Sequence, residues 1–282
     1  MAVEAIERLQ LKVLKAAVPL LMSPANYRDG DEQFRMTVSA VRELSEHVRR
    51  ITFHAERFAT FAITGPDEYC GLIFPARAGQ PLTLPDPGRV NVRTAVARIP
   101  EAERPEIRWY TIRSIRPDAA EIDVDVIVHG DCGPGSAWAL RAAAGDIVGF
   151  RAAGSAYRRQ PAGGRQLLVA DETAMPALYA ILETLPPGVD GVTAILELPD
   201  ESYDTGSASP IRPQVALRGS GAPGSAALEV VRQGSVDGLR YVWACGESAL
   251  ATGTRRHLVK DRGVDRRSIM FSGYWKVGQA RN

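Results

Sequence analysis

The second half of the chain alternates short apolar strands with helical segments, and this pattern constrains the fold more than any other feature of the sequence. Strand-like runs occur at 166–170, 191–198, 240–246 and 268–275, separated by helical patterns at 172–185, 225–234 and 247–263. Strands that alternate with helices form βαβ units with a mostly parallel sheet. Ligands bind such sheets beyond the carboxyl ends of the strands, which here predicts the loops "ADETAMP" and "ACGES".

The first half has a different pattern, with many short strands punctuated by Gly and Pro. Strands are predicted at 35–44, 48–55, 69–75, 107–115, 121–130 and 145–150, with a short helix beginning near Ser136. Such a pattern is typical of an antiparallel β-barrel or sandwich. We therefore expect an N-terminal helical extension at 1–34, a β-barrel domain at 35–155 and an α/β domain at 156–282.

Composition excludes several classes of function. With 34 Lys+Arg against 33 Asp+Glu, the net charge of +1 gives no bulk electrostatic reason to expect a nucleic-acid partner. The three cysteines form no C-x-x-C pair, and the four histidines show no ligand-like spacing. The sequence therefore predicts neither a disulfide framework nor a metal site.

The N-terminal stretch "MAVEAIERLQLKVLKAAVPLLM" is amphipathic rather than continuously apolar. It lacks the pattern of a signal peptide, and no stretch of the chain reaches the ~18 apolar residues of a membrane span. We expect a cytoplasmic protein whose terminal helix packs on the body or on another subunit. A helix lying on a membrane surface is the alternative.

The hexapeptide "RWYTIR", residues 108–113, carries more polar and cationic side chains than a simple core strand needs. An exposed edge strand often has this composition, because aromatic, β-branched and Arg side chains fit a half-buried pleated surface. A binding site is the other interpretation.

Five motifs decide between these interpretations. "RWYTIR", "VDVIVHGDCGPGSAW", "LLVADETAMPAL", "YVWACGES" and "SGYWKVG" occur in the order and spacing of the siderophore-interacting protein family, which the chain resembles from about Arg35 to Gly278. These proteins are FAD-binding reductases of the ferredoxin-reductase-like superfamily. The resemblance implies an antiparallel FAD-binding barrel followed by a parallel-sheet domain that binds NAD(P)H.

The resemblance also implies roles for residues on the FAD side. Arg108 would face the FAD pyrophosphate, Tyr110 would lie against the isoalloxazine or ribityl, and Thr111 would lie near flavin N5. The tight loop of Gly133 and Gly135 would present the helix that begins at Ser136, whose N–H groups can receive a phosphate. His129 would lie beside the FAD; a lone His at a strand end is otherwise more often structural.

On the nicotinamide side, the resemblance places four residues in the two loops beyond the parallel strands. Asp171, Thr173 and Glu247 would position the nicotinamide ring, and the small Cys245 would let it approach the flavin to about 3–3.5 Å, as hydride transfer needs. Asp171 and Thr173 can instead cap the following helix, and capping and cofactor contact can coexist.

Two positions depart from the pattern of ferric-siderophore reductases, where a lysine commonly stands at Gly71 and often an arginine at Ala137. Both bear on the chelate pocket. The remaining cationic candidates for the acceptor are Lys276 and Arg113, and a solvated Lys276 at a strand end is the competing interpretation.

The resemblance implies an FAD-dependent enzyme that passes electrons from NAD(P)H to an Fe(III)-siderophore and releases the iron as Fe(II). One alternative is a reductase of the same fold with another acceptor, such as a free ferric chelate, a quinone or a redox protein. Another is a protein that binds siderophore or flavin without turnover. NADH and NADPH are not distinguished: Glu197 can accept from ribose hydroxyls, and Arg218 can meet a 2′-phosphate.

Overall fold

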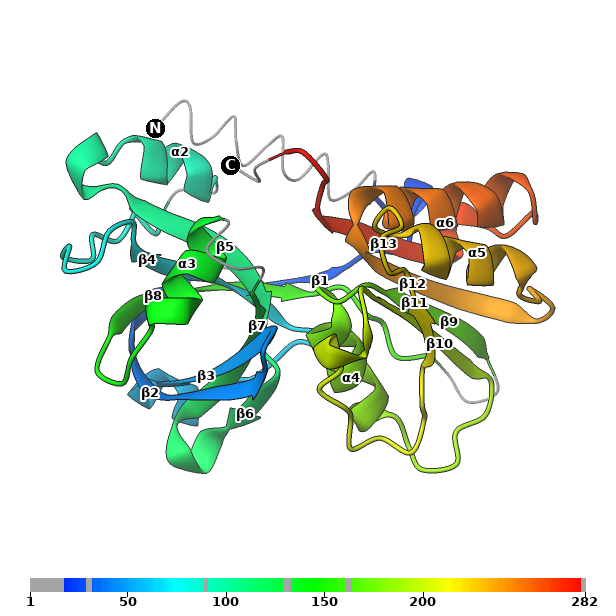
Figure 1. The fold of residues 1–282 in the computed structure, drawn as a ribbon, viewed down its shortest axis with the longest axis horizontal. Coiled ribbons are helices and arrows are strands. Elements are labelled where there is room, and N and C mark those ends of the chain that lie inside the picture. Colours follow the sequence, from blue (N-terminus) through cyan, green and yellow to red (C-terminus); the bar gives the residue numbers. More distant parts are fainter. Residues whose placement is uncertain (1–17, 29–31, 89–90, 129–132, 161–163, 280–282) are drawn as a thin grey trace.

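The computed structural model describes residues 18–28, 32–88, 91–128, 133–160 and 164–279, which form two sheets side by side (Figure 1). The first sheet has the strand order β5-β4-β8-β2-β3-β7-β6, with β1 paired to β8. Every pairing in it is antiparallel. Its strands are β1 (Asn26–Tyr27), β2 (Gln33–Ser45), β3 (Val48–His54), β4 (Tyr69–Pro75), β5 (Pro105–Thr111), β6 (Ser114–Arg116), β7 (Glu121–Ile127) and β8 (Ile147–Ser155).

This first domain curls on itself, because the two ends of the strand order, β5 and β6, are consecutive along the chain. Its core lies inside the curl, where the rings of Phe58 and Phe61 each meet Phe150 edge to face. Helix α3 (Pro134–Arg141) closes one end and stacks Trp138 on Phe74 at 5.0 Å between ring centroids. The short helix α2 (Val92–Ala97) precedes β5.

The second domain is a five-stranded parallel sheet with helices on both faces. Helix α4 (Met175–Thr184) packs its apolar side chains on one face, and α5 (Ser225–Gln233) and α6 (Ser248–Lys260) pack on the other. The strand order is β11-β10-β9-β12-β13. The strands are β9 (Arg165–Ala170), β10 (Val192–Leu198), β11 (Gln214–Leu217), β12 (Leu239–Glu247) and β13 (Ile269–Trp275).

The strand order reverses between β9 and β12, since β10 and β11 lie on one side of β9 and β12 and β13 lie on the other. At such a reversal the loops after the two central strands diverge and leave a crevice at the carboxyl ends. The loops "ADETAMP" and "ACGES" follow β9 and β12, so the fold brings together the two loops that the sequence singled out.

The predicted fold class is confirmed: an antiparallel, barrel-like first domain is followed by a parallel α/β domain. Three details differ. The predicted strand at 107–115 is broken after Thr111, because the next two amides bond elsewhere, Ile112 to the carbonyl of Glu68 and Arg113 to that of Asp123, each at 2.8 Å. Helix α3 begins at Pro134 rather than Ser136, since proline suits the first helical position. Helix α2 and strand β11 were not predicted.

The N-terminal segment touches both domains. The Ser23 amide donates to the Ile269 carbonyl of β13 at 3.0 Å, and three residues later β1 begins its pairing with β8 of the first domain. Most of the predicted terminal helix, residues 1–17, lies outside the described residues. Among the helices that the structure describes, none has the length and apolar character to cross a membrane.

Candidate functional site

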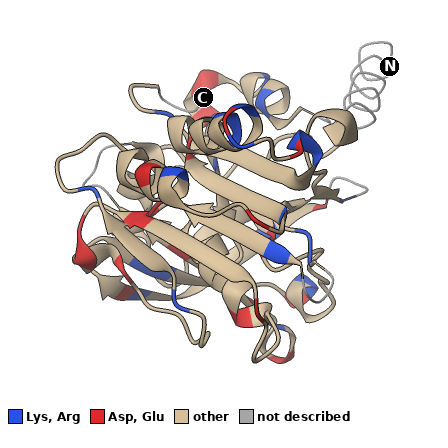
Figure 2. Cartoon of the chain, turned by 90° about the vertical axis from the view of Figure 1, so that its right-hand side faces the viewer, with Lys and Arg blue, Asp and Glu red and all other residues tan. Residues whose placement is uncertain are grey.

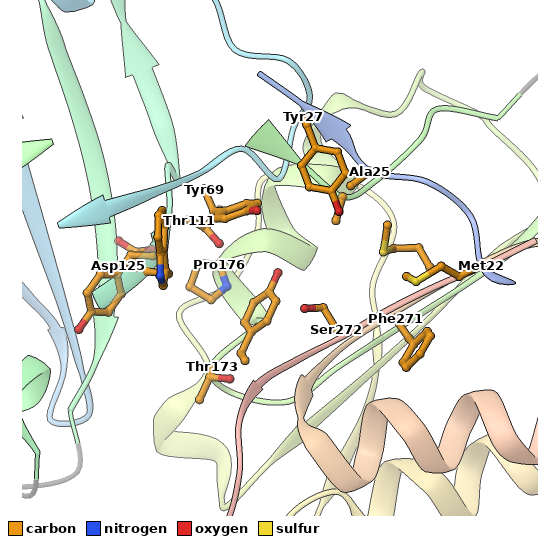
Figure 3. Close-up of a pocket in the computed structure, with 15 residues that line it drawn as sticks. Met22, Ala25, Tyr27, Tyr69, Thr111, Asp125, Thr173, Pro176, Phe271 and Ser272 are labelled. Atoms are coloured by element: carbon orange, nitrogen blue, oxygen red, sulfur yellow. The ribbon is translucent and has the colours of Figure 1, made fainter. Parts of the chain in front are cut away.

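A pocket of about 320 Å³ lies between the two domains (Figure 3). The first domain contributes the start of β4 and the end of β5, and the second contributes β13 and the loop after β9. Its lining residues are Met22, Ala25, Tyr27, Tyr69, Trp109, Tyr110, Thr111, Asp125, Ala156, Thr173, Pro176, Met270, Phe271, Ser272 and Tyr274. The pocket therefore brings Tyr110 and Thr111 of "RWYTIR" opposite Thr173 of "ADETAMP".

The β5 strand meets the start of helix α3. A Cβ atom added to Gly135 would collide with the Tyr110 hydroxyl, so only glycine permits this close approach. Burial raises the pKa of Tyr110 to about 12, against the smaller lowering effect of Arg108. The neutral phenol therefore faces the helix at neutral pH. Sequence reasoning expected these residues to share a site, and the structure brings them together.

Arg108 lies beside the same helix, and its guanidinium contacts the Glu106 carboxylate at 2.9 Å and the Ile107 carbonyl at 2.7 Å. Its side chain is 23% exposed. This partly accessible cation can exchange the Glu106 contact for a phosphate group, which also offers bidentate acceptor geometry.

The N-terminus of α3 has the features of an anion site. Gly133 supplies no capping side chain, and its φ of 96° belongs to the left-handed region that favours glycine. Uncapped N–H groups at a helix start attract negative charge. With Arg108 close by, these donors are suited to a phosphate or diphosphate group. The Ser136 hydroxyl contacts the Ile127 carbonyl at 3.5 Å, and His129 lies outside the described residues.

Asp171 joins the ends of three parallel strands. Its carboxylate accepts from the amide of Thr173 at 2.9 Å, from the amide of Glu247 at 2.6 Å and from the indole N–H of Trp275 at 2.8 Å. A Cβ atom on Gly246 would come within 2.5 Å of the Asp171 Cγ, so glycine is needed here for this approach. Asp171 thus holds together the last three motifs of the sequence.

This carboxylate is fully buried, and burial raises its pKa to about 6, assisted by the nearby Glu172 and opposed by its hydrogen bonds. Asp171 stabilises the turn before α4 rather than capping the helix, because it accepts from the amide of Ala174, the N-cap residue, at which no side-chain cap bond forms. Thr173 donates its hydroxyl to the same carboxylate at 2.6 Å and lines the pocket, so it supports the turn before α4 and is also accessible to a ligand.

Glu247 and Cys245 lie behind the pocket surface. The Glu247 carboxylate caps α6 by accepting from the amides of Ala249 and Leu250, and it is 2% exposed. Cys245 is fully buried, and its side chain is hydrogen-bonded to Tyr274, which does line the pocket. Burial raises the pKa of the thiol well above its usual value. Any influence of Cys245 on a ligand therefore passes through Tyr274.

The two cationic candidates for the acceptor do not line the pocket. Arg113 forms a two-pronged ion pair with Glu183 of α4, at 2.7 Å for both contacts, and so connects the two domains. Lys276 follows β13 and is exposed. At Gly71 the indole of Trp109 covers the space where a side chain would stand, since a Cβ atom there would lie 3.2 Å from the ring.

Glu197 and Arg218 are both engaged inside the second domain. Glu197 is fully buried and accepts from the amides of Gly224 and Ala227 at the start of α5. Arg218 pairs with Glu172 through two contacts, at 2.6 and 2.7 Å. Both charged groups therefore already have partners within the domain.

Sequence reasoning missed Asp67 and the aromatic lining of the pocket. Asp67 is 1% exposed and accepts from the amides of Ala156 and Tyr157, directly after β8, and from the Trp243 indole of β12. A single Asp in a loop carries no motif, so no sequence signal marked it. Tyr69 and Trp109 lie close in sequence to residues that were singled out, and in the β4–β5 ladder Tyr69 pairs with Thr111 and Trp109 with Gly71.

The face of the molecule in Figure 2 carries positive and negative segments side by side, without one sign dominating. This distribution agrees with the nearly equal numbers of basic and acidic residues in the sequence.

Comparison with known proteins gives the family. The sequence matches the family described as "Siderophore-interacting FAD-binding domain" over residues 37–157 and the one described as "Siderophore-interacting protein" over residues 164–278. An uncharacterised protein of Mycobacterium tuberculosis is 32% identical, with 86% of this chain and 89% of that protein covered. The ferric vibriobactin reductase ViuB of Vibrio cholerae is 30% identical over 56% of this chain and 55% of its own length.

Solved structures agree with these matches. A siderophore utilization protein from T. fusca superposes with a TM-score of 0.76 at 27% identity, covering 91% of this chain and 97% of that one. The ferredoxin reductase of carbazole 1,9a-dioxygenase, at 15% identity and a TM-score of 0.61 over 86% of this chain and 69% of that one, shares the fold. The chain therefore belongs to the siderophore-interacting protein family, whose first domain binds FAD, within the ferredoxin-reductase-like fold.

Proposed function

We propose that this protein is an FAD-dependent reductase that takes electrons from NAD(P)H and passes them to a ferric siderophore, which then releases its iron as Fe(II). The observation that carries the proposal is the position of the pocket, where Thr111 of the FAD-binding domain faces Thr173 and Ser272 of the parallel-sheet domain. A flavin ring and a nicotinamide ring can meet only at such a junction, since hydride transfer requires near contact. The name of the ferric vibriobactin reductase supports the choice of acceptor.

Bound FAD supplies the redox chemistry, because it can take up two electrons as hydride and give them up singly. The balance is one NAD(P)H and two Fe(III) to one NAD(P)⁺, two Fe(II) and one proton. The chain's own residues bind and orient. Arg108 and the first turn of α3 would hold the diphosphate, Tyr110 would support the ring, and Thr111 would lie near N5.

On the donor side, Asp171 fixes the loops after β9 and β12 so that Thr173 and the small Gly246 leave room for the nicotinamide. Glu247 caps α6 at the point where β12 ends. Cys245 positions the side chain of Tyr274 through the hydrogen bond between them. Lys276 is exposed after β13 and does not line the pocket, so it would act only by long-range attraction, and only on an acceptor that carries negative charge.

The test is an anaerobic titration of the FAD-loaded protein with NADH and, separately, NADPH, followed by addition of a ferric siderophore. We expect the flavin absorbance to bleach with at least one donor and to return on addition of the chelate, with Fe(II) trapped by a colorimetric chelator. Bleaching without recovery would favour the second candidate, a reductase with another acceptor. No bleaching with either donor would favour a binding protein without turnover.

A further inference from the structure

Two aromatic side chains cover the outer face of the antiparallel β4–β5 pair at the pocket. Tyr69 pairs with Thr111 across the ladder, and Gly71 pairs with Trp109, so these four residues share one face of the sheet. The rings of Tyr69 and Trp109 meet edge to face, with centroids 5.8 Å apart and planes at 72°. Because Gly71 has no side chain, Ile107 and the edge of the Trp109 indole occupy the space beside it, where a Cβ atom would lie 3.0 and 3.2 Å from them.

A third ring comes from the N-terminal segment. Tyr27 belongs to β1, pairs with Gly154 of β8 and lines the same pocket while 46% exposed. The segment is fixed beside it by Arg28, which donates to Glu68 at 2.6 Å and lies 4.1 Å from the centroid of the Phe61 ring. We call Tyr27, Tyr69 and Trp109 the aromatic wall. Figure 3 shows Tyr27 and Tyr69 on the opposite side of the pocket from Thr173.

The charge of the pocket complements this wall. Within the described part of the chain, its lining includes no Lys, Arg or His, and its one carboxylate, Asp125, is paired with Arg50 at 2.6 and 2.7 Å. A chelate with several negative charges would lose its hydration in this pocket without gaining a partner, which is costly. An uncharged chelate with aromatic rings would lose little and gain stacking, worth a few-fold to about ten-fold in affinity for each good ring contact.

We propose that the aromatic wall is the acceptor subsite, and that it selects ferric chelates whose ligands carry aromatic rings and whose net charge is close to zero. The reduction of such a chelate rests on the proposed function; its binding does not. Tyr69 lies directly opposite Thr111, so a ring docked on the wall would place the iron next to the part of the pocket assigned to the flavin ring.

Two pairs of tris-hydroxamate complexes vary the aromatic ring while the net charge stays constant. Ferric benzohydroxamate and ferric acetohydroxamate have the same donor atoms and no net charge, and differ in a phenyl against a methyl group. Their gallium(III) counterparts are not reduced, so their binding to the FAD-loaded protein can be measured by calorimetry without turnover. Each titration contains excess hydroxamate, and metal-free hydroxamate is the blank.

We expect the gallium benzohydroxamate complex to bind about 3- to 10-fold more tightly than the acetohydroxamate complex. Trp109→Leu should remove most of this preference, and so should Tyr27→Leu, whose exposed position leaves folding intact. His54→Ala, which removes an exposed ring outside the pocket, should leave it unchanged. Equal binding of the two complexes to the wild type would overturn the proposal, as would a preference that survives both wall substitutions. Failure of NAD(P)H to bleach the flavin would instead count against the proposed function.

Discussion

The carboxylate of Asp67, in the loop before β4, accepts a hydrogen bond of 3.1 Å from the indole N–H of Trp243, in the centre of the second domain's sheet. The same carboxylate accepts from the backbone amide of Tyr157, where the chain passes from one domain to the other. One buried side chain therefore fixes the linking segment and the position of the two domains relative to each other. Since the pocket lies at this junction, its shape depends on a residue that does not line it.

The first prediction concerns pH. Burial raises the pKa of Asp67 to about 6, against the opposing hydrogen bonds, from an ordinary value of 3.8. Between these values the native state binds more proton than the unfolded state, so the contribution of Asp67 to stability falls as pH rises and then levels off above about 6. Asp67→Asn cannot titrate. The destabilisation that it causes should therefore shrink between pH 4 and pH 7, by on the order of 3 kcal/mol.

Urea unfolding of both proteins across this range measures the difference, in which the titrations shared by wild type and variant cancel. These include Asp171, whose pKa is also raised, and Asp123, whose pKa lies at about 2 because Arg116, Ser114 and Thr52 bind it despite its burial. A destabilisation that grows with pH would mean that the hydrogen bonds outweigh burial at Asp67.

The second prediction tests the FAD contact of Arg108. Arg108→Ala removes a charge-assisted bond to phosphate worth about 1.5–3 kcal/mol, so FAD affinity should fall roughly ten- to a hundred-fold. Flavin fluorescence titration gives the dissociation constant. Arg77→Ala, at an exposed loop position in the same domain, is the matched control and should bind FAD normally. Unaltered affinity in Arg108→Ala would remove this residue from the site.

The third prediction addresses Asp171. In Asp171→Asn one carboxylate oxygen becomes an NH2 group, which then faces donors: the Glu247 amide and Trp275 indole on one side, or the Thr173 and Ala174 amides on the other. The loops after β9 and β12 should move apart, and small displacements of a hydride donor are costly. Stopped-flow reduction of the flavin by NAD(P)H should slow by about ten-fold or more, with FAD affinity retained. Trp275→Phe, which removes a single donor, should show a smaller effect of the same kind; reduction at the wild-type rate in both variants would mean that the loops keep their geometry without Asp171.

The fourth prediction separates nucleotide choice from helix capping. Glu197→Gln weakens the cap of α5 and removes a negative charge that faces the Arg218 guanidinium. We expect a loss of about 1–3 kcal/mol in the free energy of unfolding. The ratio of flavin reduction rates with NADH and NADPH should not change. Glu229→Gln, on the exposed face of the same helix, should change neither quantity. A changed NADH-to-NADPH rate ratio in Glu197→Gln would mean that the Glu197 carboxylate contacts the nucleotide.

The sequence pattern predicted the order of the main strands and helices, because burial imposes a period of two on the first sheet and continuous apolar runs on the second. It could not predict that the strand starting near Ile107 would break after Thr111, since the cause is a bond from Ile112 to Glu68, distant in sequence. The pattern also could not show on which face of the sheet the Cys245 side chain of β12 would lie. All residues from 241 to 247 are buried, so no alternation marks the side that faces the pocket.

The short strand β1 restricts how the two domains can move. The chain crosses between them twice, once at Ala156 and Tyr157 and once through residues 23–27, and both crossings are held by hydrogen bonds. The Asp67–Trp243 hydrogen bond and the Arg113–Glu183 ion pair add two further contacts between the domains. Ala25, Tyr27 and Ala156 all line the pocket, so both crossings form part of its wall. A change in the width of the pocket therefore requires a change in the segments that join the two domains.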